Sequence, residues 1–186
     1  MNFVAHAVVA GEPAPFAFGA MVPDLLKLVR GAPLETDSDE VAAGVRAHHA
    51  VDSAFHDHAT FKAWMRVVRA ELGGTRIAFA AAHVGVELAM DGVLLERSRT
   101  VAFDGALDWA RDELDGPWRE LAERAPEVVD AYRTPAGVAR RTAGAISRRP
   151  RLSRLTLDER DLARAIGVVL PDIESGLDAV LDDCSR

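Results

Sequence analysis

The stretch from Ile77 to Leu95 (IAFAAAHVGVELAMDGVLL) constrains the fold more than any other part of the chain. Every residue in it is apolar or Gly except His83, Glu87 and Asp91. A helix that is apolar all round is buried, and a spacing of four residues places successive side chains only about 40° apart around the axis. The sequence therefore predicts a central buried helix that carries one polar stripe.

This polar stripe needs partners, because removing a carboxylate from water costs several kcal/mol unless a cation, a metal ion or hydrogen-bond donors compensate it. One interpretation is a purely structural network, in which arginines of neighbouring helices neutralise Glu87 and Asp91. The other is a polar cleft inside a helical protein, in which the two carboxylates help to bind a metal ion. The spacing alone leaves both interpretations open.

Length and composition indicate one helical domain. The chain has 186 residues, of which 49% are hydrophobic, and convincing strand alternation is absent. We expect an all-α, single-domain helical bundle over residues 1–186. The lone cysteine, Cys184, excludes an intramolecular disulfide and a thiolate-rich metal site, which fits a cytoplasmic location. The N-terminus makes a poor signal peptide, and no uninterrupted apolar run is long enough to cross a membrane.

Further candidate ligands lie outside the central stretch. A lone histidine in an apolar segment, such as His6, is usually a hydrogen-bonded core residue. Asp24 lies in the first turn of a predicted helix, so it either stabilises the helix dipole or points inward as a ligand. His48 and Asp52 are four residues apart, which suits a shared divalent ion and equally a simple hydrogen bond. Four of the six histidines lie within residues 48–58, which favours a functional site there.

Two local predictions affect this histidine-rich region. We expect a helix over about Asp39 to Ser53, and we interpret Phe55 to Ala59 (FHDHA) as a turn before the next helix. On this interpretation, His56 and His58 lie outside regular structure.

The charge distribution is uneven. The net charge of −7 argues against a nucleic-acid partner, yet residues 131–157 contain seven arginines and no acidic residue. The guanidinium group suits phosphate and carboxylate, so this arginine window predicts docking of an anionic partner. The alternative is that the arginines pair with the acidic helices on either side.

Several motifs occur together in one order along the chain. They are MNFVAH at residues 1–6, the segment from Gly19 to Asp24 before Lys27, GVRAHHAVD at residues 44–52, His58, Asp91, and SRRPRL at residues 147–152. In order and approximate spacing, they resemble the acyl carrier protein phosphodiesterase family from residue 1 to about residue 155.

The resemblance implies an all-helical fold related to the HD-domain phosphohydrolases, with a divalent metal ion that is most often Mn²⁺, with Mg²⁺ or Fe²⁺ as alternatives. It implies hydrolysis of the phosphodiester that joins 4'-phosphopantetheine to a serine of acyl carrier protein. That acidic protein is a suitable partner for the arginine window. The metal ligands that match the family pattern are His6, Asp24, His48, Asp52 and Asp91.

Mixed imidazole and carboxylate ligands suit such an ion. Besides Asp24, the predicted catalytic residues are His83 and Glu87, which would orient water or relay a proton. The predicted substrate-binding residues are Lys27, Arg148, Arg149 and Arg151. Two other functions stay open: an HD-like metal-dependent phosphohydrolase of a nucleotide or other small phosphate ester, and a non-catalytic module that binds an acidic partner.

Overall fold

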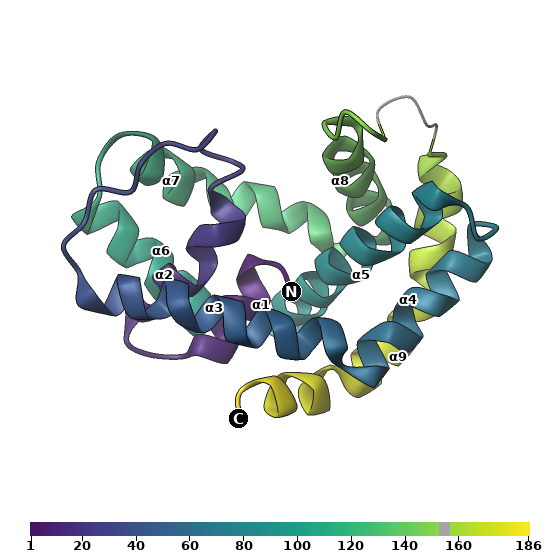
Figure 1. Cartoon of the computed structure of the whole chain (residues 1–186), viewed down its shortest axis with the longest axis horizontal. Coiled ribbons are helices and arrows are strands. Elements are labelled where there is room, and N and C mark those ends of the chain that lie inside the picture. The colour runs from purple at the N-terminus through teal and green to yellow at the C-terminus, as the bar shows by residue number, and fades with distance from the viewer. Residues whose placement is uncertain (153–156) are drawn as a thin grey trace.

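The computed structural model describes residues 1–152 and 157–186, and Arg154 of the arginine window lies outside these residues. Within the described part, the chain forms nine α-helices, one short 3-10 helix and no strand, so the predicted all-α fold is confirmed (Figure 1). The elements are α1 (Phe3–Ala10), α2 (Ala14–Leu25), α3 (Asp39–Asp57), α4 (Ala59–Glu71), α5 (Arg76–Glu96), α6 (Val101–Glu113), α7 (Gly116–Asp130), η1 (Ala131–Arg133), α8 (Pro135–Ser147) and α9 (Glu159–Cys184).

The apolar stretch predicted to be central forms α5. The hydroxyl of Thr75 accepts a hydrogen bond from the backbone N–H of Ala78 at 3.3 Å, which caps the start of this helix. Helix α5 packs against α1, α4, α8 and α9. In the described part of the chain, it is the one helix long and apolar enough to cross a membrane. Two-thirds of its most apolar window is buried inside the protein, as expected for the core helix of a folded domain.

The helices form two packed groups that meet around α1 and α5 (Figure 1). Helices α2, α6 and α7 lie at one end of the molecule, and α4, α8 and α9 lie at the other. Helix α3 runs along both groups, with close contacts to α2 at its start and to α4 and α9 near its end. The side chains of α1, α3 and α5 therefore converge where the two groups meet.

Helices α2 and α3 cross at two glycines. A Cβ atom on Gly19 would lie 2.2 Å from the carbonyl oxygen of Val41, and one on Gly44 would lie 2.1 Å from that of Phe16. Neither separation is sterically possible, so only glycine permits this close approach of the two backbones. The crossing sets the distance between α3 and the end of α2, on which Asp24 lies.

Candidate metal centre

Two groups of possible ligands lie side by side at the junction of the helices. The first group consists of His6 from α1 with His48 and Asp52 from α3, and one ligand atom of each lies within 4.8 Å of the others. His6 and His48 are buried, and the Asp52 side chain is 30% exposed. Three of the five predicted metal ligands are thus brought together by two helices far apart in sequence.

The orientation of His48 is set by a backbone carbonyl. Its Nδ1 lies 2.8 Å from the carbonyl oxygen of Ala20 on α2, and a carbonyl oxygen can only accept. Nδ1 therefore carries the proton and donates it, which leaves a lone pair on Nε2. Metal-binding histidines commonly donate their other ring N–H in this way. The ring of His48 also stacks on that of His6, with 3.9 Å between the ring centroids.

Asp24 adjoins the first group. Its Oδ2 lies 3.9 Å from Nε2 of His6, and that nitrogen lies 3.6 Å from Oδ1 of Asp52. Both distances are too long for hydrogen bonds. Among the described residues, His6 Nε2 and Asp24 Oδ2 are both buried and have no hydrogen-bond partner. Leaving such an atom unpaired costs about 1–3 kcal/mol, so each needs a partner that the protein itself does not supply.

A divalent cation fits these atoms. Two ligands bonded to one ion at about 2.1 Å can lie at most about 4.2 Å apart, and the distances around His6 Nε2 are within this limit. Burial lowers the pKa of His6 and so favours the neutral form that can bind a metal ion. The predicted ligands His6, His48 and Asp52 therefore lie close enough together to be candidates for one metal centre, and Asp24 adjoins them through His6.

The second group consists of His56 from α3 with His83 and Glu87 from α5. Oε1 of Glu87 lies 3.1 Å from Nε2 of His56 and 3.3 Å from Nε2 of His83. On its other side, His56 places Nδ1 3.2 Å from Oδ2 of Asp52, so this histidine joins the two groups. The N-terminal amino group of Met1 also donates to Asp52 at 2.9 Å and to Glu87 at 3.3 Å.

The predicted turn over Phe55 to Ala59 is wrong, and for this reason His56 is not among the predicted site residues. Helix α3 continues to Asp57 and ends at His58, whose Nδ1 accepts from the backbone N–H of Thr60 and caps α4. His56 is therefore helical and shares a face with Asp52, four residues earlier. The spacing of four residues between Asp52 and His56 is the feature of the sequence that could have indicated this.

Burial and nearby charges have opposite effects on the pKa values of Asp52 and of the second group. Burial raises the pKa values of Asp52 and Glu87. For Asp52, the interaction with His56 and the positive charge of the Met1 ammonium outweigh burial, and for Glu87 the Met1 ammonium and His56 do so, which holds both pKa values well below the usual range. Hydrogen bonds to Asp52 and then to Glu87 raise the pKa of His56 to about 9. In the metal-free protein, His56 is thus an imidazolium between two carboxylates.

This arrangement predicts a pH dependence of stability. A histidine whose pKa is raised from 6.5 to about 9 on folding stabilises the protein fully below pH 6.5, and this contribution is lost as the pH rises through 9. We expect the free energy of unfolding of the metal-free protein, measured by urea denaturation with chelator, to fall over that range. The fall should be smaller in His56→Gln. Because the nearby carboxylates of Glu87 and Asp52 also raise the pKa of the Met1 amino group above 8.0, against the effect of burial, the difference between the two proteins isolates the histidine. Equal slopes would contradict its assigned charge.

Asp91 belongs to neither group. It is completely buried, and its carboxylate accepts hydrogen bonds from Nδ2 of Asn2 at 2.6 Å, the backbone N–H of Ala5 at 2.9 Å and that of Val4 at 3.3 Å. It therefore caps the first turn of α1, the helix that carries His6. Burial raises the pKa of Asp91 to about 7, although these hydrogen bonds act in the opposite direction.

The polar stripe on α5 thus has partners other than arginine. Among the described residues, Glu87 contacts two histidines and the N-terminal amino group, and Asp91 contacts an amide and two backbone N–H groups. The interpretation in which arginines neutralise the stripe is therefore wrong for the described part of the chain.

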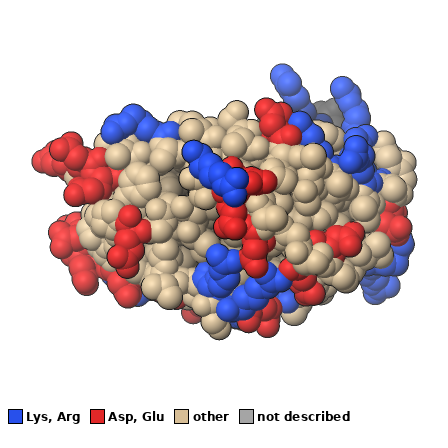
Figure 2. All heavy atoms as spheres, turned by 90° about the horizontal axis from the view of Figure 1, so that it is seen from below, with Lys and Arg blue, Asp and Glu red and all other residues tan. Residues whose placement is uncertain are grey.

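The predicted substrate-binding residues lie in two places. Lys27 follows α2, and its Nζ lies 3.5 Å from Oδ1 of Asp24 at the edge of the first group, with the side chain 77% exposed. Arg148, Arg149 and Arg151 follow α8, are exposed, and form no ion pair with another described residue. Figure 2 shows Lys and Arg side chains projecting beside the residues drawn in grey.

These three arginines are not brought together with the ligand groups. Helix α8 packs on the face of α5 that includes Gly85, where Thr142 lies close to the helix backbone. Each residue of a helix turns by about 100°, so two residues turn by about 200°. Gly85 and Glu87 therefore lie about 160° apart around α5, on nearly opposite faces. Within the window, Arg133 does pair with Asp130 of the preceding acidic helix, at 3.0 Å, so that alternative holds for this arginine. Arg133 also pairs with Glu96 of α5, at 3.0 Å.

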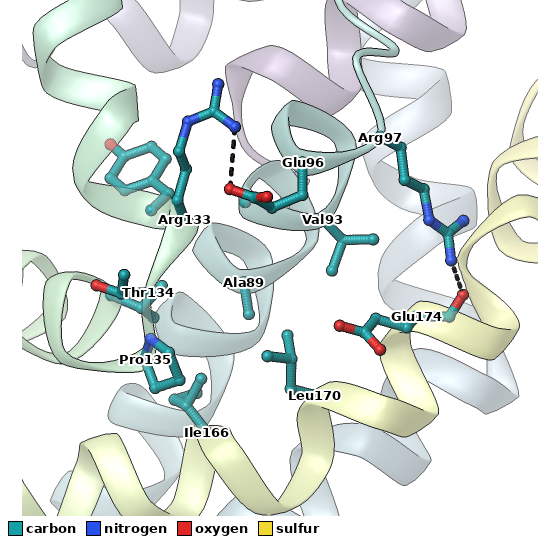
Figure 3. A pocket seen from close by; sticks show the side chains of 13 residues that line it. Ala89, Val93, Glu96, Arg97, Arg133, Thr134, Pro135, Ile166, Leu170 and Glu174 are labelled. Carbon is teal, nitrogen blue, oxygen red and sulfur yellow. Dashed lines mark hydrogen bonds and ion pairs between the residues drawn. The ribbon is translucent and has the colours of Figure 1, made fainter.

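A pocket of about 300 Å³ lies on this opposite side of α5, against α9 and the segment before α8 (Figure 3). Glu96 and Arg133 pair across it, and the Arg97 guanidinium donates to the backbone carbonyl of Glu174. Its lining includes no histidine, and its two arginines are engaged in this way. The convergent ligands of the protein therefore lie on the other face of the helix.

Comparison with known proteins identifies the family. The family model described as acyl carrier protein phosphodiesterase matches residues 1–101, which include α1 to α5 and every member of both ligand groups. No curated protein and no solved structure matched the chain, so the relation to HD-domain phosphohydrolases stays a prediction. Since the match covers more than half of the 186 residues, the chain belongs to the acyl carrier protein phosphodiesterase family.

Proposed function

We propose that this protein is a metal-dependent phosphodiesterase that hydrolyses the bond between 4'-phosphopantetheine and the serine of holo acyl carrier protein. The family supports phosphodiesterase activity on acyl carrier protein, and so a hydrolase. The observation that carries metal dependence is the pair of buried, unpartnered atoms His6 Nε2 and Asp24 Oδ2, which lie 3.9 Å apart beside His48 and Asp52.

The proposed centre uses the four side chains His6, Asp24, His48 and Asp52 as ligands. A divalent cation held there supplies Lewis-acid chemistry, because it polarises a phosphoryl oxygen and lowers the pKa of a water molecule. Mn²⁺ is the metal that the family resemblance favours, and Mg²⁺ and Fe²⁺ suit the same donors. Because His6 and His48 are buried and Asp52 is partly exposed, the substrate approaches from the side of Asp52.

Two of the predicted catalytic residues lie near the proposed centre. His83 is 31% exposed and contacts Glu87, and both lie on the other side of His56 from Asp52. We assign to them an action on a phosphodiester held at the first group, either by moving a proton or by holding a second cation. The third, Asp24, adjoins Lys27, whose ammonium group is placed to attract the phosphodiester charge.

The carrier protein is the proposed partner of the exposed arginines. Since α5 separates Arg148, Arg149 and Arg151 from the ligand groups, we assign them to long-range attraction of the acidic carrier and not to contact with the bond that breaks.

The experiment that tests this function is intact-protein mass spectrometry of holo acyl carrier protein incubated with the enzyme and Mn²⁺. We expect loss of the phosphopantetheine mass in the complete reaction, and no loss with chelator or with Asp24→Ala. Retention of the full mass, with a sample shown by elemental analysis to contain Mn²⁺, would overturn the proposed substrate and favour a small phosphate ester. Retention without bound metal would favour a non-catalytic binding module.

A further inference from the structure

We propose that the second group, His56, His83 and Glu87, binds a divalent cation of its own, so that the protein holds two ions on either side of Asp52. The inference rests on the proposed function in one respect: it takes the first group as the site of the other ion. The site uses one residue that the sequence analysis missed and two for which it predicted a different role.

The distances within the second group fit a shared ion. Two ligands bonded at about 2.1 Å to one ion lie about 3.0 Å apart at an angle of 90° and about 3.4 Å apart at the tetrahedral angle. Oε1 of Glu87 lies 3.1 Å from Nε2 of His56 and 3.3 Å from Nε2 of His83. Two imidazoles and a carboxylate form a donor set that suits Mn²⁺, Fe²⁺ or Zn²⁺.

His56 has the orientation of a metal-binding histidine. Its Nδ1 lies 3.2 Å from Oδ2 of Asp52, and an ionised carboxylate can only accept, so Nδ1 carries a proton. Nε2 is the nitrogen that faces Glu87 and His83, and a carboxylate behind the other nitrogen raises its strength as a ligand. His48 in the first group uses the same nitrogen pattern, with the carbonyl of Ala20 in place of the carboxylate.

Asp52 connects the two sites through its two oxygens. Oδ1 faces Nε2 of His6 in the first group, at 3.6 Å, while Oδ2 faces Nδ1 of His56. The two sites therefore share one carboxylate, which faces a histidine of each group.

An entry path to the second site is present. A pocket of about 310 Å³ opens beside it. It is lined by His56 and His83, by the apolar side chains of Phe61, Met65 and Phe79, and by three basic residues, Lys62, Arg66 and Arg69. Solvent and a metal ion can reach the imidazoles through this pocket, while the apolar walls strengthen electrostatic interactions inside. With one ion held by the first group and one by His56, His83 and Glu87, the two sites together would supply positive charge for both the attacking and the leaving oxygen of a phosphodiester.

The test is the stoichiometry of Mn²⁺ binding to the purified, metal-stripped full chain, measured by isothermal titration calorimetry and by elemental analysis after gel filtration. We expect two ions per chain in the wild type, one in His83→Gln and one in Glu87→Gln. His49→Gln, which removes an exposed histidine outside both groups, should keep two. The wild type with two ions should also show spin coupling between them in its electron paramagnetic resonance spectrum, and His83→Gln should not.

The outcomes separate this inference from the proposed function. One ion in the wild type that is lost in His6→Gln but kept in His83→Gln would overturn the second site and leave the first. One ion that is lost in His83→Gln but kept in His6→Gln would support the second site and overturn the first. No bound ion in the wild type would overturn both. His83 is partly exposed and Glu87→Gln preserves shape, so circular dichroism should show both variants folded.

Discussion

Replacing His48 with Ala should lower the rate of Mn²⁺-dependent release of 4'-phosphopantetheine at least about 100-fold. Changing a residue that merely supports a metal-binding histidine costs about 10- to 100-fold, so loss of the ligand itself should cost at least the upper value. The effect should be this large because Nε2 of His48 is held in one position as a ligand. The carbonyl of Ala20 orients the ring from one side, and the ring of His6 stacks on it from the other.

The neighbouring histidine provides a matched control. His49 is exposed, and its ring lies edge-on to that of His48 with 5.4 Å between centroids. Activity of His49→Ala should stay within about twofold of the wild type, since exposed substitutions usually change little. Rates should be measured at saturating Mn²⁺, with thermal unfolding monitored in parallel. A folded His48→Ala protein that retains wild-type activity would contradict the proposed centre.

Replacing Asp91 with Ala should lower the free energy of unfolding of the metal-free protein by about 3 kcal/mol at pH 6. The substitution leaves the Asn2 amide and the N–H groups of Val4 and Ala5 without an acceptor in the protein interior, and each unpaired group costs about 1–3 kcal/mol. For a chain of this length, the melting temperature should fall by roughly 6–12 °C. We choose pH 6 because Asp91, with a pKa of about 7, is mostly neutral at that pH. The substitution then removes no buried charge, which would otherwise offset part of the stability lost with the hydrogen bonds.

This measurement separates the cap from the ligand that the family resemblance implied for Asp91. A cap stabilises the protein whether or not metal is present, whereas a ligand acts only when metal is bound. Unchanged stability of metal-free Asp91→Ala, together with weaker Mn²⁺ binding, would contradict the assignment as a cap.

A comparison with Asp91→Asn adds a pH test. The folded-state pKa is raised above 3.8, so the stability that the neutral carboxyl contributes is present below pH 3.8 and is lost as the pH rises through 7. Asparagine does not titrate. The wild type should therefore lose stability relative to Asp91→Asn between pH 4 and 7, and a constant difference would contradict the raised pKa.

The buried helix could be predicted from a local pattern in the sequence. For the first group, the only local signal was the spacing of His48 and Asp52, and its use as a ligand set was implied by the family resemblance. An apolar stretch of helical length predicts α5, and residues 77 to 95 are indeed mostly buried. The polar stripe on it was harder to interpret. Successive residues drift by about 40° with each step of four, so His83 and Asp91 point about 80° apart and meet different neighbours: α3 and α4 for His83, and the start of α1 for Asp91.

What could not be predicted depends on contacts between distant segments. The predicted end of α3 is too early, because the residues around His56 have the composition of a turn, whereas in the structure His56 is helical and contacts Glu87 on α5. The close crossing at Gly19 and Gly44 brings Ala20 to His48, yet a glycine in a sequence does not reveal which backbone approaches it. The role of Asp91 required knowledge of how α1 docks on α5.

The most direct test of the central claim is anomalous diffraction at the manganese edge from crystals of the protein grown with Mn²⁺. The proposed centre predicts an anomalous peak bonded to Nε2 of His6 and of His48 and to carboxylate oxygens of Asp24 and Asp52. A map from fully occupied crystals with manganese elsewhere, or with these four side chains unligated, would contradict it.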